Sequence, residues 1–242
     1  MSSDLGPDLP ILGALTRRVP YGTSLLVEFE SRSIWNEASL TIAAHALKNG
    51  VPTEYHTFQR VPGEIRNSLA NLGLNVKELQ ENGVFTVTDS YTIQTRLGNP
   101  EISDVSASNS LKLADWSIDD SKHMKAGIPE SEKRQLHIDD NISILLDYNE
   151  EKEFIDYYRT RLIPFARAHE MIALHAIVTD IASDSFYKKL ESLCDGIIEF
   201  KSEEREGRIG QQVRMSAFRG RRFDSRWRRL QLLESGEVTL VD

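Results

Sequence analysis

The sequence predicts an α/β fold in which a mostly parallel central sheet is covered by helices on both faces. Short apolar runs bounded by turn residues alternate with segments whose apolar residues recur at helical spacing. Strands that alternate with helices require a parallel sheet with both faces covered. The C-terminal part instead contains consecutive strand patterns separated by Gly220 and by Ser235–Gly236, which predicts antiparallel strands at one edge of that sheet.

The first ninety or so residues contain three strand-and-helix patterns. Expected strands cover residues 22–29, 51–58 and 84–88. A helix with apolar residues at 40, 43, 44 and 47 follows the first strand and ends before Asn49–Gly50. Pro62 opens a second helix that Gly73 ends, and residues 76–82 form one or two further turns. Together these patterns predict alternating strands and helices from the start of the chain.

Residues 91–140 are polar and poorly periodic. They predict a flexible or partly helical insertion that contains one short element near residues 111–118. The regular pattern returns with an apolar run at 142–147, which predicts a strand that ends in Asp147. A helix that Pro164 kinks or shortens follows this strand.

The remaining elements complete the predicted sheet. Expected strands cover residues 171–178, 196–200, 211–218, 226–233 and 238–241, and a helix covers 186–193. No Gly/Ser-rich or Pro-rich linker divides the 242 residues, so a single domain, 1–242, is expected.

Composition narrows the range of functions. The single cysteine, Cys194, excludes a disulfide framework, and the six histidines show no spacing typical of zinc, so no metal site is expected. The first ten residues are acidic rather than basic and lack the apolar core of a signal peptide. The longest apolar run, 171–178, is far shorter than the roughly 20 residues that span a bilayer. A soluble cytoplasmic protein without a membrane partner is expected.

Positive charge gathers near the C-terminus of a chain whose net charge is −8. Residues 214–229 hold seven arginines and one aspartate. Four of the arginines are candidate interface residues: Arg219, Arg221, Arg222 and Arg226. This strip could bind an anionic partner, or it could be a solvated pair of edge strands.

Six short stretches, taken in order, resemble the RecA superfamily and, within it, the KaiC-like ATPases. They are residues 19–27 (VPYGTSLLV), 72–85, 88–90 (TDS), 144–147 (ILLD), 194–198 (CDGII) and 218–220 (FRG). The resemblance implies a RecA-like three-layer α/β/α domain. It implies that residues 28–39 stand in the place of the phosphate-binding loop and that Asp147 ends the Walker B strand.

The stretch in the place of the phosphate-binding loop lacks what triphosphate binding requires. An active loop has glycines that expose backbone N–H groups, a lysine for the phosphates and a hydroxyl for Mg²⁺. Residues 28–39 (EFESRSIWNEAS) contain neither glycine nor lysine. Glu28, Glu30 and Glu37 add negative charge, and Arg32 is the one cation of this stretch. Ordinary binding of ATP is therefore not expected.

Two further departures concern catalysis. KaiC-like enzymes carry paired glutamates at the end of the second strand, where this chain has Gln59 and Arg60, and neither side chain is a base. The lysine of the family's KxRG motif corresponds to Ala217, while Arg219 is kept. Asp147 either holds Mg²⁺ through water or caps the following helix, and the cap is favoured.

The sequence thus predicts a RecA/KaiC-like pseudo-ATPase with no catalytic residues and no cofactor, acting as a regulatory or scaffolding protein, for example in signal transduction. Its degenerate nucleotide pocket comprises Glu30, Arg32, Asn36, Gln59, Arg60 and Asp147. A protein partner or a homo-oligomer is expected. The resemblance implies rings whose subunits are commonly held together by nucleotide, and this chain is not expected to bind nucleotide, so a dimer is favoured over a hexamer. Two alternatives remain: a nucleotide-binding protein or ATPase with an unconventional phosphate loop, and a nucleic-acid-binding module. Binding of nucleic acid through the arginines is expected to be weak at most.

Overall fold

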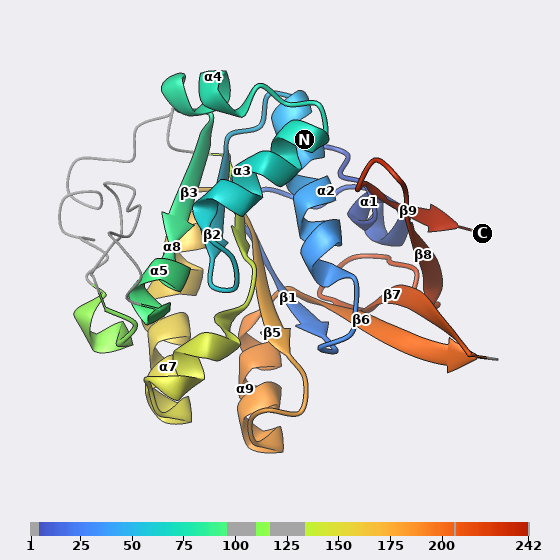
Figure 1. The fold of residues 1–242 in the computed structure, drawn as a ribbon. Helices are drawn as coiled ribbons and strands as arrows, with labels where there is room; N and C mark the ends of the chain where they lie inside the picture. The colour runs from blue at the N-terminus through green and yellow to red at the C-terminus, as the bar shows by residue number, and fades with distance from the viewer. Residues whose placement is uncertain (1–4, 96–109, 117–133, 206, 242) are drawn as a thin grey trace.

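The computed structural model describes residues 5–95, 110–116, 134–205 and 207–241, and these residues form one nine-stranded sheet with helices on both faces (Figure 1). The strand order is β3-β2-β4-β5-β1-β6-β7-β8-β9. The first six strands of that order are parallel to one another, and β7, β8 and β9 continue the sheet in antiparallel fashion. The predicted fold class, a mostly parallel sheet with antiparallel C-terminal strands, is confirmed.

The strands are β1 (Thr23–Phe29), β2 (Thr53–Thr57), β3 (Phe85–Asp89), β4 (Leu136–Asp139), β5 (Ile172–Val178), β6 (Gly196–Arg205), β7 (Arg208–Phe218), β8 (Arg228–Leu232) and β9 (Val238–Val241). The predicted strands at 22–29, 51–58, 84–88, 171–178 and 238–241 are confirmed to within two residues at either end. The strand β6 runs five residues further than predicted, because its polar second half pairs with β7 in a long hairpin.

The α-helices are α1 (Leu12–Thr16), α2 (Trp35–Lys48), α3 (Pro62–Asn71), α4 (Val76–Glu81), α5 (Ser90–Thr95), α7 (Glu151–Tyr157), α8 (Ile163–Ala168) and α9 (Asp184–Leu193). Shorter helical turns are η1 (Leu113–Asp115), η3 (Ile142–Asp147) and the π-turn η4 (Tyr158–Leu162). The helix that begins at Glu151 is divided into α7, η4 and α8, and Pro164 stands in the first turn of α8. Proline lacks the N–H that a regular helix would use at this point.

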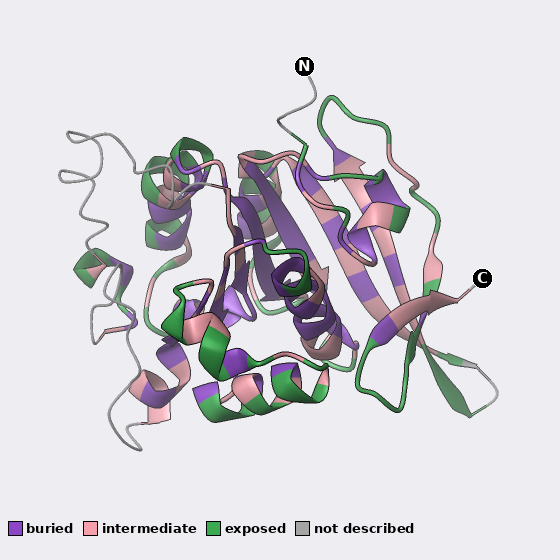
Figure 2. Ribbon diagram, turned by 90° about the horizontal axis from the view of Figure 1, so that it is seen from above, coloured by how far each residue is buried: buried purple, intermediate pink, exposed green. Residues whose placement is uncertain are grey.

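Two apolar layers sandwich the central strands, which are buried along their length (Figure 2). Alternate residues of a strand point to opposite faces. Leu25 and Val27 of β1 therefore pack with α1, α2 and α3, whereas Leu26 packs with Phe154 and Phe186 on the α7–α9 face. Strands β7, β8 and β9 extend the sheet past β6, and Val213, Leu230 and Val238 join the same apolar core as α1 and α2, whereas much of β8 is exposed.

The segment 91–140 is not one continuous insertion, which corrects the sequence-based expectation. Its last residues form β4, a central strand between β2 and β5. The strand was missed because it has only four residues, of which His137 and Asp139 are polar. The short turn η1 lies inside the expected 111–118 element, and residues 96–109 and 117–133 lie outside the described residues.

Residues 142–147 form a 3₁₀ helix rather than the predicted strand. The side chain of Asn141 accepts a hydrogen bond from the backbone N–H of Ser143 at 3.1 Å, which turns the chain away from the sheet directly after β4. Asp147 is therefore an exposed residue at the end of η3. Glu150, not Asp147, occupies the N-cap of α7, where it forms a capping box with Glu153.

Helices long and apolar enough to cross a bilayer were sought in the described ranges, and none was found.

Candidate functional site

The loop between β1 and α2 is held in place by side chains from the C-terminal hairpin. The backbone N–H of Ile34 donates to Gln211 Oε1 at 3.0 Å, and Gln211 Nε2 donates to the carbonyl oxygen of Arg32 at 3.2 Å. Glu30 Oε2 accepts hydrogen bonds from both the N–H and the hydroxyl of Ser202, at 2.9 and 3.1 Å. One amide at the start of α2 and one carboxylate of the loop are thus bound to the protein itself.

Arg60 lies against the first turn of α2. Its Nη2 donates to the hydroxyl of Tyr55 at 3.2 Å and to the carbonyl oxygen of Asn36 at 3.4 Å. The Tyr55 hydroxyl also lies 2.8 Å from Ser39 Oγ. Three buried polar atoms near this helix start have no hydrogen-bond partner among the described residues: Ser33 Oγ, Asn36 Oδ1 and Arg60 Nε. The first turn of α2 thus combines an arginine with unsatisfied donors and acceptors.

Asp140 follows β4 and links it to the neighbouring elements. Its Oδ1 accepts from the Phe58 N–H at 2.7 Å, its Oδ2 lies 3.0 Å from the Thr57 hydroxyl, and its carbonyl oxygen accepts from Trp35 Nε1 at 2.9 Å. Burial raises the pKa of Asp140 to about 6, although the bond from Phe58 opposes the rise. Asp140 therefore joins the end of β2, through its carboxylate, to the start of α2, through its carbonyl oxygen.

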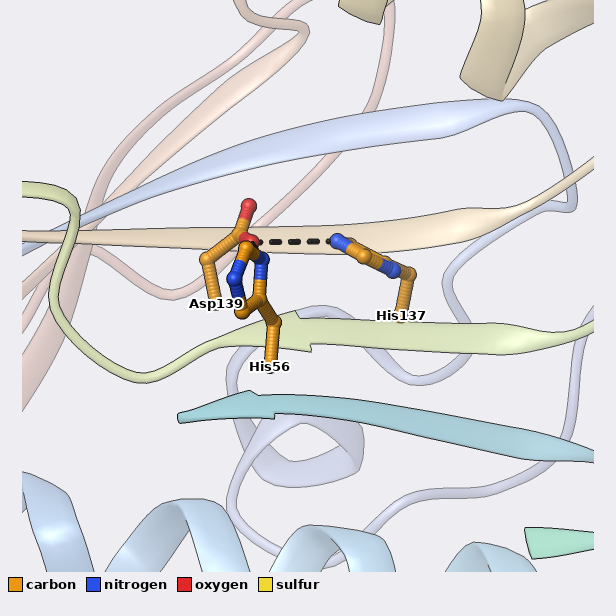
Figure 3. A group of neighbouring side chains, drawn as sticks. All are labelled: His56, His137 and Asp139. Carbon is orange, nitrogen blue, oxygen red and sulfur yellow. Dashed lines mark hydrogen bonds and ion pairs between the residues drawn. The ribbon is translucent and has the colours of Figure 1, made fainter. Parts of the chain in front are cut away.

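A second polar cluster lies on the α7–α9 face of the sheet and consists of His56, His137 and Asp139 (Figure 3). We call it the histidine cluster. His56 Nδ1 and His137 Nε2 each lie 3.1 Å from Asp139 Oδ1. The three ligand-type atoms are within 4.8 Å of one another. His56 comes from β2 and the other two residues from β4.

The outer atoms of the histidine cluster also have partners. His137 Nδ1 lies 3.2 Å from Glu54 Oε2, and His56 Nε2 lies 2.7 Å from Ser90 Oγ. Asp139 Oδ2 lies 2.7 Å from Nδ1 of His175, a fully buried residue of β5. The register explains the convergence, because His56 and His175 both pair with Asp139 across the parallel ladder.

Charge within the cluster is strongly coupled. Burial alone would lower the pKa of His137, but the carboxylates of Asp139 and Glu54 outweigh it and hold that pKa well above its usual value. Burial would raise the pKa of Asp139, but His137 and the other two imidazoles hold it well below its usual value. These directions favour the charged form of His137 beside two carboxylates.

The C-terminal arginines are divided between internal contacts and one exposed recess. Three of them bind carboxylates: Arg214 contacts Glu199, and Arg226 and Arg228 contact Asp224. Arg219 Nη2 donates to the carbonyl oxygen of Ser192 at 2.7 Å. Exposed arginines at positions 17, 18, 221 and 222 line one shallow recess, which we call the basic recess.

No family model matches the sequence, and comparison with curated proteins also gives no match. Comparison of the fold with solved structures does give matches. One is a KaiC-like protein from the hyperthermophilic archaeon Pyrococcus horikoshii, with a TM-score of 0.66 over 98% of both chains at 12% sequence identity. The chain has a KaiC-like fold.

The KaiC-like fold confirms the resemblance that the six sequence stretches predicted, at the level of architecture. Five of the six residues predicted for the degenerate pocket lie at the two expected places: Glu30, Arg32 and Asn36 around the start of α2, and Gln59 and Arg60 after β2. Contacts between Arg60 and Asn36 join these two places. Asp147 is the exception, and Asp140, which follows β4, is the carboxylate that contacts residues 57 and 58 beside Gln59 and Arg60.

Of the predicted interface arginines, only Arg221 and Arg222 line the basic recess. Residues 219–227 form the connection between β7 and β8, so the strand predicted at 226–233 begins later, at Arg228. Sequence analysis missed the histidine cluster. Its signal is a polar residue at every second position of two strands, Glu54 and His56 in β2 and His137 and Asp139 in β4, and it could be recognised only once β4 was known to be a strand.

Proposed function

We propose that this KaiC-like chain is a pseudo-ATPase that does not hydrolyse ATP and acts as a regulatory or scaffolding protein, for example in signal transduction. The observation that carries the proposal is the loop between β1 and α2, which has neither glycine nor lysine and whose Ile34 amide is bound by Gln211. Phosphate binding at a helix start depends on free N–H groups and added positive charge.

The electrostatics around the end of β1 support the same proposal. Glu28 lies on β1 directly opposite Glu199 of β6, and one of its oxygens is buried with no partner in the described ranges. Burial, together with the carboxylates of Glu191 and Glu199, raises the pKa of Glu28 to about 7. Glu28 alternates with Val27 and so lies on the α7–α9 side of β1, where its charge adds negative potential near the end of this strand; that potential disfavours the several charges of a triphosphate.

The end of β2 lacks a group to activate water. Arg60 donates hydrogen bonds to α2, and Gln59 is an amide. Neither residue can accept a proton from an attacking water molecule. Asp140 is a carboxylate in the neighbourhood, but both of its oxygens already contact groups of residues 57 and 58.

One observation favours a second candidate, a protein that binds nucleotide through an unconventional loop. Ser33 Oγ, Asn36 Oδ1 and Arg60 Nε are buried beside the start of α2 and have no partner within the part of the chain that the structure describes. Buried polar atoms in folded proteins usually have partners, so an anionic ligand could satisfy the two donors among them.

Calorimetric titration with ATP, ADP and GTP in the presence of Mg²⁺, followed by a phosphate-release assay, separates the two candidates. For the pseudo-ATPase we expect no phosphate release and no nucleotide Kd tighter than about 1 mM. A Kd of that size corresponds to a binding free energy of about 4 kcal/mol in favour of the complex. A micromolar Kd that is lost in Arg60→Gln but kept in the exposed control Asp147→Ala would reject the proposal and support the unconventional loop.

A further inference from the structure

We propose that the histidine cluster is a binding site for one divalent transition-metal ion, with His56 Nδ1, His137 Nε2 and Asp139 Oδ1 as its ligands. Imidazole and carboxylate donors suit ions such as Zn²⁺, whereas Mg²⁺ and Ca²⁺ prefer oxygen ligands alone. The inference does not depend on the proposed function, because the cluster lies on the opposite face of β2 and β4 from α2.

The distances from the two imidazole nitrogens to Asp139 Oδ1 are close to those around such an ion, and all three ligand atoms lie within 4.8 Å of one another. Tetrahedral zinc with bonds of about 2.0–2.2 Å holds its ligand atoms roughly 3.3–3.5 Å apart. Both imidazole nitrogens lie 3.1 Å from Asp139 Oδ1, so an ion requires these two separations to widen by only a few tenths of an ångström. With three protein ligands, the fourth position of the ion remains open.

Each ligand is oriented by a further contact, which is the arrangement found around metal sites in proteins. Glu54 Oε2 can accept the Nδ1–H of His137, which leaves the lone pair on Nε2 directed at the ion. Ser90 Oγ can likewise accept the Nε2–H of His56. His175 Nδ1–H donates to Asp139 Oδ2, so the other carboxylate oxygen, Oδ1, is left for the metal.

Charge balance favours a divalent cation. Glu54 and Asp139 are two carboxylates in a buried network, and their ion pairs within the described ranges are with histidines. With the imidazoles neutral, the network carries two negative charges, which one divalent ion neutralises. Buried charges in proteins are paired or coordinate metals.

The strands preorganise the site and aromatic rings shield it. His56 and Asp139 are register partners on adjacent strands, and Glu54 and His137 are the next pair on the same face of the sheet. The rings of Phe58 and Trp116 lie 4.2 and 5.7 Å from the His56 ring, centroid to centroid. A ligand set on a rigid sheet loses little conformational freedom when the ion binds.

The test is a titration of the tag-free full chain, stripped with EDTA, with Zn²⁺ against a chromophoric chelator. We expect about one Zn²⁺ per chain, a micromolar or tighter Kd, and no comparable binding of Mg²⁺. His137→Gln and Asp139→Asn should weaken binding at least about 100-fold, and Glu54→Gln, which keeps every ligand, about 10–100-fold. The matched control is His45→Gln on α2, for which the affinity should be unchanged.

Two further measurements separate loss of the site from loss of the fold. Circular dichroism checks each apo variant, and Co²⁺ bound to the wild-type protein should show the intense visible d–d bands of a tetrahedral site with nitrogen ligands. Failure of the wild-type chain to bind Zn²⁺, or equal affinity of the folded His137→Gln variant and the wild type, would overturn the proposal. In that event, the cluster is a network of hydrogen bonds and ion pairs alone.

Discussion

Glu28 shows how a single residue can oppose the stability of the fold that contains it. It lies in β1 opposite Glu199 of β6, and Glu191 adds a third carboxylate nearby. Burial and these two neighbours raise the pKa of Glu28 to about 7. The folded protein therefore holds a proton at a pH where the unfolded chain has released it.

Glu28→Gln should stabilise the protein at pH 8 and have little effect at pH 4. As pH rises from about 4.5 to about 7, the unfolded chain releases the proton first, so wild-type stability falls and the full penalty is present above pH 7. Because Glu28 is partly exposed, solvent screens its charge. The free energy of unfolding of Glu28→Gln at pH 8 should therefore exceed that of the wild type by about 1–2 kcal/mol. Urea unfolding of both proteins at both pH values measures it.

The exposed Glu234→Gln serves as the control, and its effect should be small at either pH. An equal gain from Glu28→Gln at pH 4 and pH 8 would contradict the assignment of the penalty to ionisation of this carboxyl group.

At the scale of elements, the start of β6 shows how closely the sheet is packed. Gly196 pairs with Leu25 of β1 on one side and with Phe218 of β7 on the other. A Cβ atom added here would lie 2.8 Å from Leu25 Cδ2, 3.0 Å from the Ala217 carbonyl oxygen and 3.1 Å from Phe218 Cδ2. Because one of these atoms belongs to the backbone of β7, side-chain rotation alone cannot relieve the contacts.

Gly196→Ala should therefore destabilise the protein by about 1–3 kcal/mol. Gly63→Ala in α3 is the matched control, since its added Cβ has no atom within 4 Å and its φ is not in the left-handed region. That control should leave stability unchanged or raise it slightly, because alanine favours helix. Thermal and urea unfolding measure the stability of the two variants. Equal stabilities would show that the β7 backbone shifts to make room for the new methyl group.

For the whole molecule, the distribution of charge suggests how it meets a partner. The chain carries a net charge of −8, yet the basic recess gathers four exposed arginines from two distant segments of the sequence. Opposite charges on two surfaces favour their association and make it sensitive to salt. An acidic surface of a second copy of this chain is a partner of the required charge.

We expect the protein to form a dimer at low salt that dissociates as salt rises, as measured by light scattering during gel filtration. Arg221→Ala with Arg222→Ala should weaken the dimer. A matched control is Lys77→Ala with Lys152→Ala, which removes the same charge from two highly exposed positions. A monomer of about 27.5 kDa at every salt concentration would reject self-association and leave a different protein as the partner.

The sequence by itself determined the alternation of strands and helices and the antiparallel edge, because these depend on local periodicity and on turn residues. The KaiC-like architecture was implied by the resemblance of six short stretches to that family. The sequence also located the glycine-free loop, since that loop follows a strongly apolar strand. Asp147 was wrongly expected to end a strand, because an apolar run of six residues fits a strand or a helical turn equally well. The hydrogen bond of the Asn141 side chain to the Ser143 N–H decides between the two, and it is a detail of side-chain geometry that the pattern does not contain.

Only the tertiary structure decided which polar residues meet. His56 and Asp139 are 83 positions apart, and His175 is a further 36 positions along the chain from Asp139. No local spacing relates them. They converge because the order β2-β4-β5 and the parallel register bring their strands together, and the β4 strand is too short and too polar to be recognised from the sequence. Contacts between distant segments are fixed by sheet order and register, which the packing of the whole chain selects.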